Sequence, residues 1–275
     1  MSDQPSLTEM IDAIIKTFIV AHADDTDAHL AQALVYNAGR LAWRLREQGV
    51  NVEQKTSVSD VVTDADFAAE RFVAGVLEAL RGEDGIVGEE GANRESASGR
   101  TWVVDPVDGT YNFASGSDYW CSALALVDAD GVILGAVHRP AMGYTWFGGR
   151  EFATSLDGKD VTKLTDAPAE NLCLSTYLHP TSITDPAIAS AWEKVAPHFA
   201  TVRMLGAGSV DLSCVADGTW GAWMQHSVKD WDWYPGQALV LAAGGAARKV
   251  EAGGVEWCIA GNKQVVDQME EWLRG

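Results

Sequence analysis

Basic residues are scarce in this sequence. Lysine and arginine total 20, against 39 aspartates and glutamates, which gives a formal net charge of −19. A protein that binds a nucleic-acid backbone needs dense Lys and Arg, so this balance argues against nucleic acid as a partner. Most of the acidic excess is explained by a soluble acidic surface. The remainder can supply metal ligands, because carboxylate oxygens are the donors that Mg²⁺ prefers.

Cysteines and long apolar runs are also scarce. The four cysteines (Cys121, Cys173, Cys214 and Cys258) lie far apart, with no CxxC pair and no histidine at zinc spacing. This pattern predicts buried thiols in a reducing compartment. No window approaches about 18 uninterrupted apolar residues, and the first residues show no basic segment followed by an apolar one. We therefore expect a cytoplasmic protein with no membrane partner.

The chain has no low-complexity tract, no internal repeat and no flexible linker. Its 275 residues, 47% of them hydrophobic, suffice for a large core. From about residue 150 onward, predicted strands and helices alternate, whereas the earlier part is mixed. We therefore expect an α+β subdomain over 1–150 and an α/β subdomain over 151–275, which share an interface in a single compact unit.

The spacing of apolar residues indicates where helices and strands lie. Two helices are expected in residues 1–50, the second over 27–48 and ended by Gly49; another covers 60–80, with Asp60 and Thr63 as capping residues. Asp130 and Gly131 predict a hairpin turn between strands 121–128 and 132–138. Further strands are expected over 86–88, 101–104, 144–147, 172–175, 200–204 and 220–224, and further helices over 186–196, about 209–217, 235–243 and 263–273.

Residues 102–113 carry the clearest chemical signal. A β-branched apolar run ends in Asp105 and Asp108, and Gly109 and Thr110 follow at once. This order predicts a strand that delivers carboxylates to its carboxyl end, where α/β sheets place their sites. The two aspartates are suited to Mg²⁺, and the free amides after Gly109 can face an anion. A divalent metal beside an anion site is typical of phosphate-ester chemistry.

Three other acidic clusters lie in predicted turns. Each alone is weak evidence, because an acidic pair in a turn or at a helix start usually serves helix capping or solvation. Together they are more informative, because a carboxylate at the rim of a core is costly unless it is paired or bound to metal. The clusters are Asp60, Asp64 and Asp66; Glu89 and Glu90; and Asp230 and Asp232.

These segments resemble, in the same order, the motifs of the inositol monophosphatase family. The resemblance rests on residues 87–90, residues 105–113, and Trp231-Asp232 followed by an apolar helix and Ala-Gly-Gly at 243–245; residues 60–66 are similar to the family's upstream acidic motif. It covers about residues 55–250. It implies an α/β (α+β) fold, a layered αβαβα sandwich of the sugar phosphatase type. It also implies a Mg²⁺-dependent, lithium-sensitive hydrolase that forms a homodimer.

The resemblance further implies a metal-ligand set. Glu89, Asp105 and the Val107 carbonyl would hold one metal ion, and Asp105, Asp108 and Asp232 would hold a second. Two or three Mg²⁺ ions per site are expected, with Mn²⁺ as the alternative. Residues 1–150 then carry most of the metal ligands, and residues 151–275 complete the substrate pocket.

Catalytic and substrate-binding roles are implied in the same way. Asp66 is similar to the carboxylate near a third, weaker metal site, and with Glu89 and Thr110 it would orient the attacking water. The amides of Gly109 and Thr110 would hold the phosphate. The full substrate-binding set implied by the resemblance is Asp108, Gly109, Thr110, Gly206, Ala207, Gly208, Gln225 and Asp232.

Gln225 departs from the family pattern, which usually has a glutamate at this position. A neutral amide can hydrogen-bond a polyol but offers no charge, and the ammonium group of histidinol phosphate would prefer a carboxylate. We expect hydrolysis of myo-inositol 1-phosphate or a similar polyol or sugar phosphate. The alternatives are the same chemistry on histidinol phosphate, fructose 1,6-bisphosphate or adenosine 3′,5′-bisphosphate, and a non-catalytic regulator that binds metal or phosphate.

Overall fold

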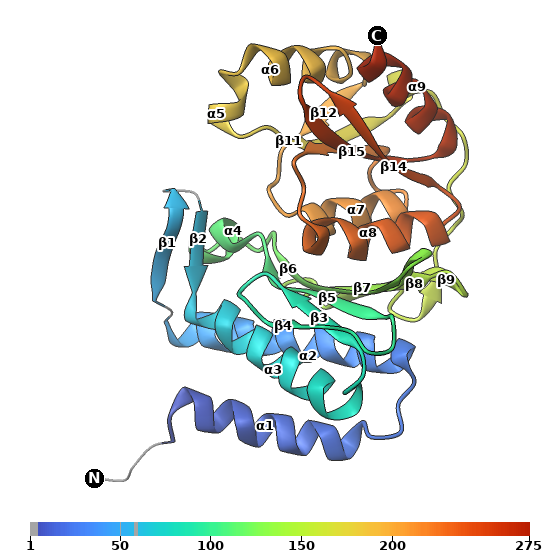
Figure 1. Cartoon of the computed structure of the whole chain (residues 1–275). Coiled ribbons are helices and arrows are strands. Elements are labelled where there is room, and N and C mark those ends of the chain that lie inside the picture. The colour runs from blue at the N-terminus through green and yellow to red at the C-terminus, as the bar shows by residue number, and fades with distance from the viewer. Residues whose placement is uncertain (1–4, 50, 58–59) are drawn as a thin grey trace.

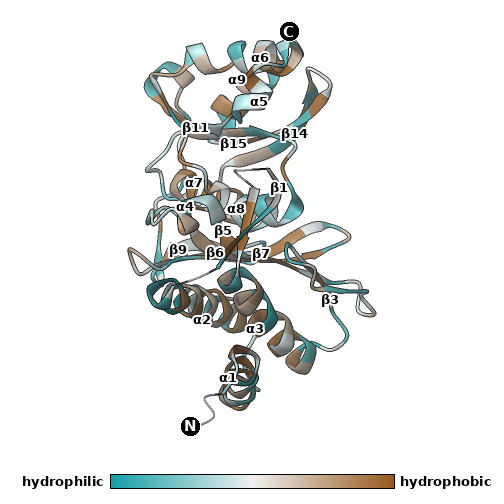
Figure 2. Ribbon diagram, turned by 90° about the vertical axis from the view of Figure 1, so that its left-hand side faces the viewer, coloured by the Kyte–Doolittle hydropathy of each residue, from teal (hydrophilic) through white to brown (hydrophobic). Residues whose placement is uncertain are grey.

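The structure is a computed structural model that describes residues 5–49, 51–57 and 60–275; of residues 55–57 and 60 it describes the backbone only. Figure 1 shows the elements stacked in layers, in the order helices, sheet, helices, sheet, helices. This is the αβαβα arrangement that was expected. Hydrophobic residues run along the inner helices and the central strands, as Figure 2 shows, and buried clusters fill the spaces between the layers.

The first helical layer contains α1 (Leu7–Ala21), α2 (Asp27–Gln48) and α3 (Asp64–Leu80). The prediction for α2 is confirmed, and Gly49 follows its last turn with a φ of +92°. The helix expected over 60–80 is correct only from Asp64, because Asp60–Thr63 forms strand β2, which pairs with β1 (Val52–Ser57). Two adjacent β-branched valines favour the strand, and Thr63 caps the helix that follows.

The first sheet has the strand order β10-β9-β8-β7-β6-β5-β3-β4. Strands β3 and β5 are parallel, and the other neighbours are antiparallel. The predicted hairpin is present as β6 and β7, whereas β9 and β10 were not predicted. The strands are β3 (Gly85–Gly88), β4 (Asn93–Arg94), β5 (Thr101–Asp108), β6 (Cys121–Asp128), β7 (Gly131–Arg139), β8 (Tyr144–Gly149), β9 (Phe152–Leu156) and β10 (Lys159–Asp160).

Two helices, α7 (Gly208–Ala216) and α8 (Asp230–Ala242), lie between the two sheets (Figure 1). Helix α8 begins five residues before the expected start at residue 235. Pro235 is typical of a first helical turn, but here it lies inside the helix. The first turn instead contains Asp230 and Asp232, whose negative charges favour a helix N-terminus.

The second sheet has the order β12-β11-β13-β15-β14, in which β12, β11 and β13 are parallel. The hairpin of β14 and β15 was not predicted. Helices α5 (Pro180–Ile183), α6 (Pro186–Glu193) and α9 (Lys263–Arg274) form the last layer (Figure 1). The strands are β11 (Cys173–Tyr177), β12 (Thr201–Arg203), β13 (Ala222–His226), β14 (Ala246–Ala252) and β15 (Val255–Gly261).

Two of the predicted absences can be compared with the structure. All four cysteines are free, and three are buried while Cys173 is half-buried. In the part of the chain that the structure describes, no helix combines the length and the apolar character needed to cross a bilayer.

Candidate active site

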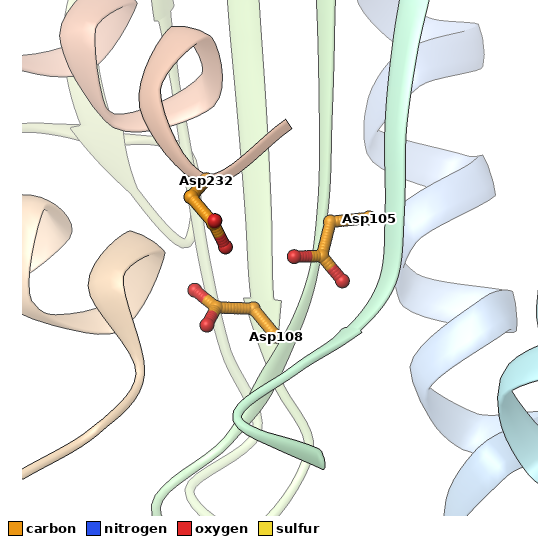
Figure 3. Close-up of side chains that lie close together, drawn as sticks. All are labelled: Asp105, Asp108 and Asp232. Atoms are coloured by element: carbon orange, nitrogen blue, oxygen red, sulfur yellow. The ribbon is translucent and has the colours of Figure 1, made fainter. Parts of the chain in front are cut away.

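Three carboxylates converge where β5 of the first sheet faces the start of α8. Asp105 and Asp108 lie in the last part of β5, and Asp232 lies in the first turn of α8. One oxygen from each lies within 4.8 Å of the others, and Figure 3 shows the three side chains pointing toward one another. The fold therefore brings together three of the carboxylates that the acidic motifs indicated.

An irregularity in β5 allows Asp105 and Asp108 to face the same space. Residues three apart in a regular strand lie on opposite faces. The pairing of β5 with β6 shifts register between these two aspartates, where Pro106 lacks an N–H for the ladder. The Ser122 hydroxyl donates to the Pro106 carbonyl at 2.6 Å and holds the bend.

The three carboxylates lack a cationic partner within the described side chains, since none of them takes part in an ion pair there. Burial raises the pKa of Asp105 well above its usual value, and the charges of Glu89, Asp108 and Asp232 raise it further. Burial also raises the pKa of Asp108 and Asp232. An all-oxygen, negatively charged donor set, with two carboxylates buried and Asp232 half-buried, fits a divalent cation such as Mg²⁺.

Asp108 is held by the start of a helix from the other half of the chain. The Gly208 amide donates to its Oδ1 at 3.2 Å, and the Ser209 amide donates to its Oδ2. These are among the first amides of α7, which lack partners within the helix. Ala207, at the N-cap, provides no side-chain cap. Asp108 therefore caps α7, and these bonds lower its pKa against the effect of burial.

Asp66 and Thr110 are brought together beside the three carboxylates. The Thr110 hydroxyl lies 3.0 Å from the Val107 carbonyl oxygen and 3.2 Å from Asp66 Oδ1. Asp66 Oδ2 accepts bonds from the amide and the hydroxyl of Thr63. Burial raises the pKa of Asp66 to about 7, and the charges of Glu90 and Glu89 act in the same direction.

Glu89 lies near this group but is not one of the three whose oxygens fall within 4.8 Å of one another. It follows β3 and lines the same cavity as Asp108. The turn that carries it is held by the buried Glu70, which accepts bonds from the amides of Glu90 at 2.8 Å and Ala92 at 2.7 Å. A Cβ at Gly88 would lie 2.2 Å from Glu70 Oε2. Glu70 was not predicted, because a glutamate inside a helix gives no signal of such a role.

Three of the acidic side chains, Glu89, Asp108 and Asp232, border a cavity of about 590 Å³. Of the substrate-binding residues implied by the resemblance, those that line it are Asp108, Gly109, Thr110, Gly206, Gly208, Gln225 and Asp232. The buried Ala207 does not line it, and the buried Asp66, Asp105 and Val107 lie behind its wall. Tyr111 of the predicted motif also lines it, and the lining residues that the sequence did not indicate include Val61, Tyr177, His179, Pro180, Met204 and Leu205.

Gly109 and Asn112 join the motif to the opposite half of the chain. Gly109 has a φ of +91°, and a Cβ there would lie 3.1 Å from the Cβ of Ala207, so only glycine is accommodated without strain. Asn112 Nδ2 donates to the carbonyls of Tyr119 at 2.8 Å and Leu205 at 2.7 Å. Residues Thr110–Ala114 form the short helix α4, and these contacts seat it against the loop before α7.

The remaining acidic residues of the motifs have other surroundings. Asp64 accepts a bond from Asn51 at 2.6 Å on the exposed surface. Asp230 is half-exposed and lies 3.9 Å from Lys249. The side chain of Asp60 lies outside the described residues. For Asp64 and Asp230 the structure thus shows surface contacts.

A larger cavity, of about 900 Å³, lies beside α8 and contains none of the three clustered carboxylates. Several of its basic residues are already neutralised: Arg150 lies 2.8 Å from Asp128, Arg248 lies 2.7 Å from Asp267, and Lys249 lies 3.0 Å from Glu256. Its size alone therefore does not make it the reaction site.

The chain is similar to known proteins over most of its length. The model of the inositol monophosphatase family matches residues 24–272. A fructose-1,6-bisphosphatase/inositol-1-monophosphatase from Aquifex aeolicus is 30% identical over 220 residues, which cover 79% of this chain and 83% of the relative. A histidinol-phosphatase from Mycobacterium tuberculosis is 39% identical over 136 residues, which cover 48% of this chain and 52% of the relative. A solved IMPase structure from Thermotoga maritima has a TM-score of 0.76 at 25% identity, with 88% of this chain and 94% of that chain covered.

Proposed function

Because the chain belongs to the inositol monophosphatase family of phosphatases, we propose that it is a Mg²⁺-dependent phosphomonoesterase. Its expected substrate is myo-inositol 1-phosphate or a similar small polyol or sugar phosphate. The observation that carries the metal dependence is the group of Asp105, Asp108 and Asp232, which the described side chains leave without a cationic partner.

In this proposal, Glu89, Asp105 and the Val107 carbonyl hold one Mg²⁺, and Asp105, Asp108 and Asp232 hold a second. A third, weaker site lies near Asp66, and Mn²⁺ can replace Mg²⁺. When bound, such ions neutralise phosphate charge and make an attacking water more acidic. Most of the catalysis in phosphoryl transfer comes from positioning and charge neutralisation.

The chain's own residues position the reacting groups. The Thr110 hydroxyl, held between the Val107 carbonyl and Asp66, would orient the attacking water together with Asp66 and Glu89. The backbone amides of Gly109 and Thr110 would bind the phosphate, and Gly206 and Gly208 would form the wall beside it. Ala207 would act indirectly, because its methyl group packs close to Gly109.

Gln225, Asp108 and Asp232 would contact the alcohol part of the substrate. None of the described residues that line the cavity is a lysine or an arginine, which supports a single phosphate over a bisphosphate. The neutral Gln225 amide supports an uncharged polyol over the ammonium group of histidinol phosphate. A non-catalytic regulator remains the alternative from another class, and the presence of every proposed ligand argues against it.

The test is phosphate release in Mg²⁺, measured side by side on myo-inositol 1-phosphate, histidinol phosphate, fructose 1,6-bisphosphate and adenosine 3′,5′-bisphosphate. The highest kcat/KM is expected for myo-inositol 1-phosphate, and chelation of the metal should stop release from every ester. Binding of Mg²⁺ without release from any of them would favour the regulator. A preference for a bisphosphate would show that cations reach the cavity from elsewhere in the chain.

Three further expectations complete the proposal. Millimolar Li⁺ should inhibit phosphate release in the presence of Mg²⁺, and insensitivity would indicate a different second metal site. The enzyme is expected to act in the cytoplasm, which its four free cysteines support. A homodimer is expected from the family resemblance, and sedimentation at micromolar concentration would test it.

A further inference from the structure

Two tyrosines line the cavity from the two halves of the molecule. We propose that Tyr111 and Tyr177 hold the alcohol part of the substrate between them and select a polyhydroxylated ring, such as a cyclitol or a sugar, over an open-chain polyol. This inference rests on the proposed phosphatase function and narrows its substrate class.

Tyr111 lies directly after Thr110, in the first turn of α4. It lines the cavity and is 55% exposed, whereas the nearby Phe113 is fully buried. Phe113 therefore anchors α4 in the core, and the fold does not need the ring of Tyr111. A large ring left half in solvent at the wall of a cavity is available for contact with a ligand.

Tyr177 is the last residue of β11 and is aligned with Gln225 on the parallel strand β13. Aligned residues on neighbouring strands point to the same side of a sheet, and both line the cavity. Burial raises the pKa of Tyr177, and interaction with Tyr111 adds to this effect. The two phenols therefore lie within electrostatic reach of each other, and Tyr177 stays neutral at physiological pH.

The chemistry of this end of the cavity fits a polyhydroxylated ring. A tyrosine offers a rigid apolar face and a hydroxyl, so it can contact the C–H face of a sugar or cyclitol and hydrogen-bond a hydroxyl at its edge. Met204, Leu205 and Pro180 add apolar surface beside the tyrosines. An open chain has no such face, and ordering its rotatable bonds costs free energy.

The experiment compares two polyol esters of secondary alcohols, myo-inositol 1-phosphate and glycerol 2-phosphate. The quantity measured is the ratio of their kcat/KM values in wild type, Tyr111→Leu, Tyr111→Phe and Tyr177→Leu. Tyr111→Leu and Tyr177→Leu should each lower the ratio roughly tenfold, the size expected for loss of one aromatic contact. Tyr111→Phe keeps the ring and should keep most of the preference.

Two controls separate ring selection from damage to the site. Tyr36→Leu removes an exposed tyrosine that does not line the cavity and should leave the ratio unchanged. The inhibition constant of inorganic phosphate, which has no ring, should be the same in Tyr111→Leu and wild type.

The outcomes distinguish this inference from the function on which it rests. If wild type hydrolyses both esters and the ratio is the same in Tyr111→Leu and Tyr177→Leu, ring selection by the tyrosines is wrong and the phosphatase function stands. If wild type hydrolyses neither ester nor any other monophosphate, the proposed function is wrong, and this inference is overturned with it.

Discussion

Two buried aspartates, Asp84 just before β3 and Asp105 in β5, differ in their partners. Asp84 is 2% exposed and accepts bonds from Ser98 at 2.7 Å, Arg100 at 2.7 Å and Trp102 at 2.9 Å. Burial alone would raise its pKa, but these bonds lower the pKa below its usual value. Asp105 is 1% exposed; burial raises its pKa, and its neighbours are other carboxylates, whose charges raise it further.

The difference is whether the protein itself supplies the neutralising charge. Asp84 is neutralised within the protein: Arg100 also bonds Asp27 at 2.6 Å, which ties the start of α2 to the start of β5. The charge of Asp105 has no such compensation among the described side chains. A bound cation would therefore offset the cost of burying this charge. Burial alone does not distinguish the two cases, whereas the sign of the partners does.

The largest expected effect is on Asp105→Asn. Loss of this shared charge should lower kcat roughly 1,000-fold, as for other preorganised groups that stabilise transition-state charge. The melting temperature without divalent metal should stay equal or rise, because repulsion with Asp108 and Asp232 is relieved. Phosphate release and thermal unfolding in EDTA measure the two effects. Retention of more than a tenth of the activity would show that the assignment of Asp105 is wrong.

The opposite pattern is expected for Asp84→Asn. The neutral amide weakens bonds to a charged partner, so the free energy of unfolding should fall by about 2 kcal/mol, while kcat of the folded enzyme stays the same. Urea denaturation gives the free energy. The matched control is Asp128→Asn, whose pair with Arg150 is more exposed and should cost below about 1 kcal/mol. Equal losses of unfolding free energy in Asp84→Asn and Asp128→Asn would contradict the structural role of Asp84.

Asp211 tests an intermediate case, a buried carboxylate that bonds the Tyr119 hydroxyl at 2.5 Å. Burial raises its pKa to about 7. The folded state therefore holds this proton more tightly than the unfolded chain, so stability falls as pH rises from about 4 to 7. Asp211→Asn removes this contribution, so its free energy of unfolding should fall less over the same pH range. Urea denaturation at several pH values in that range would measure the difference. Parallel curves for the two proteins would mean that Asp211 is ionised in the folded state.

Elements whose boundaries are set by neighbouring residues were predicted well. Gly49 ends α2, and Asp130 and Gly131 form the turn between β6 and β7. Strand β9 was missed because its central residues include Ala and Ser, which have little β preference, and it is held by pairing with β8. The start of α8 was misplaced because Pro235 resembles a helix start.

In the site, too, residues that lie close together in the sequence were predicted, and residues joined only by the fold were not. Asp105 and Asp108 were predicted because a strand, a turn and Gly109 lie together in one segment. The roles of Glu70 and Tyr177 were not, because they depend on contacts made only in the folded chain. Asn112 was part of the motif, but its bond to the Leu205 carbonyl joins positions 93 residues apart. Such partners are set by the fold and leave no local pattern.

The hydrogen bonds of Asp108 to α7 have an evolutionary consequence. A substitution at Asp108 would remove a proposed metal ligand and the cap of a central helix together. The bond that Asp105 accepts, from the Val107 amide at 3.1 Å, stays within its own turn. A descendant that abandoned hydrolysis but kept the fold would therefore be expected to lose Asp105 earlier than Asp108. Among inactive relatives, an aspartate retained at position 108 would record selection for folding alone.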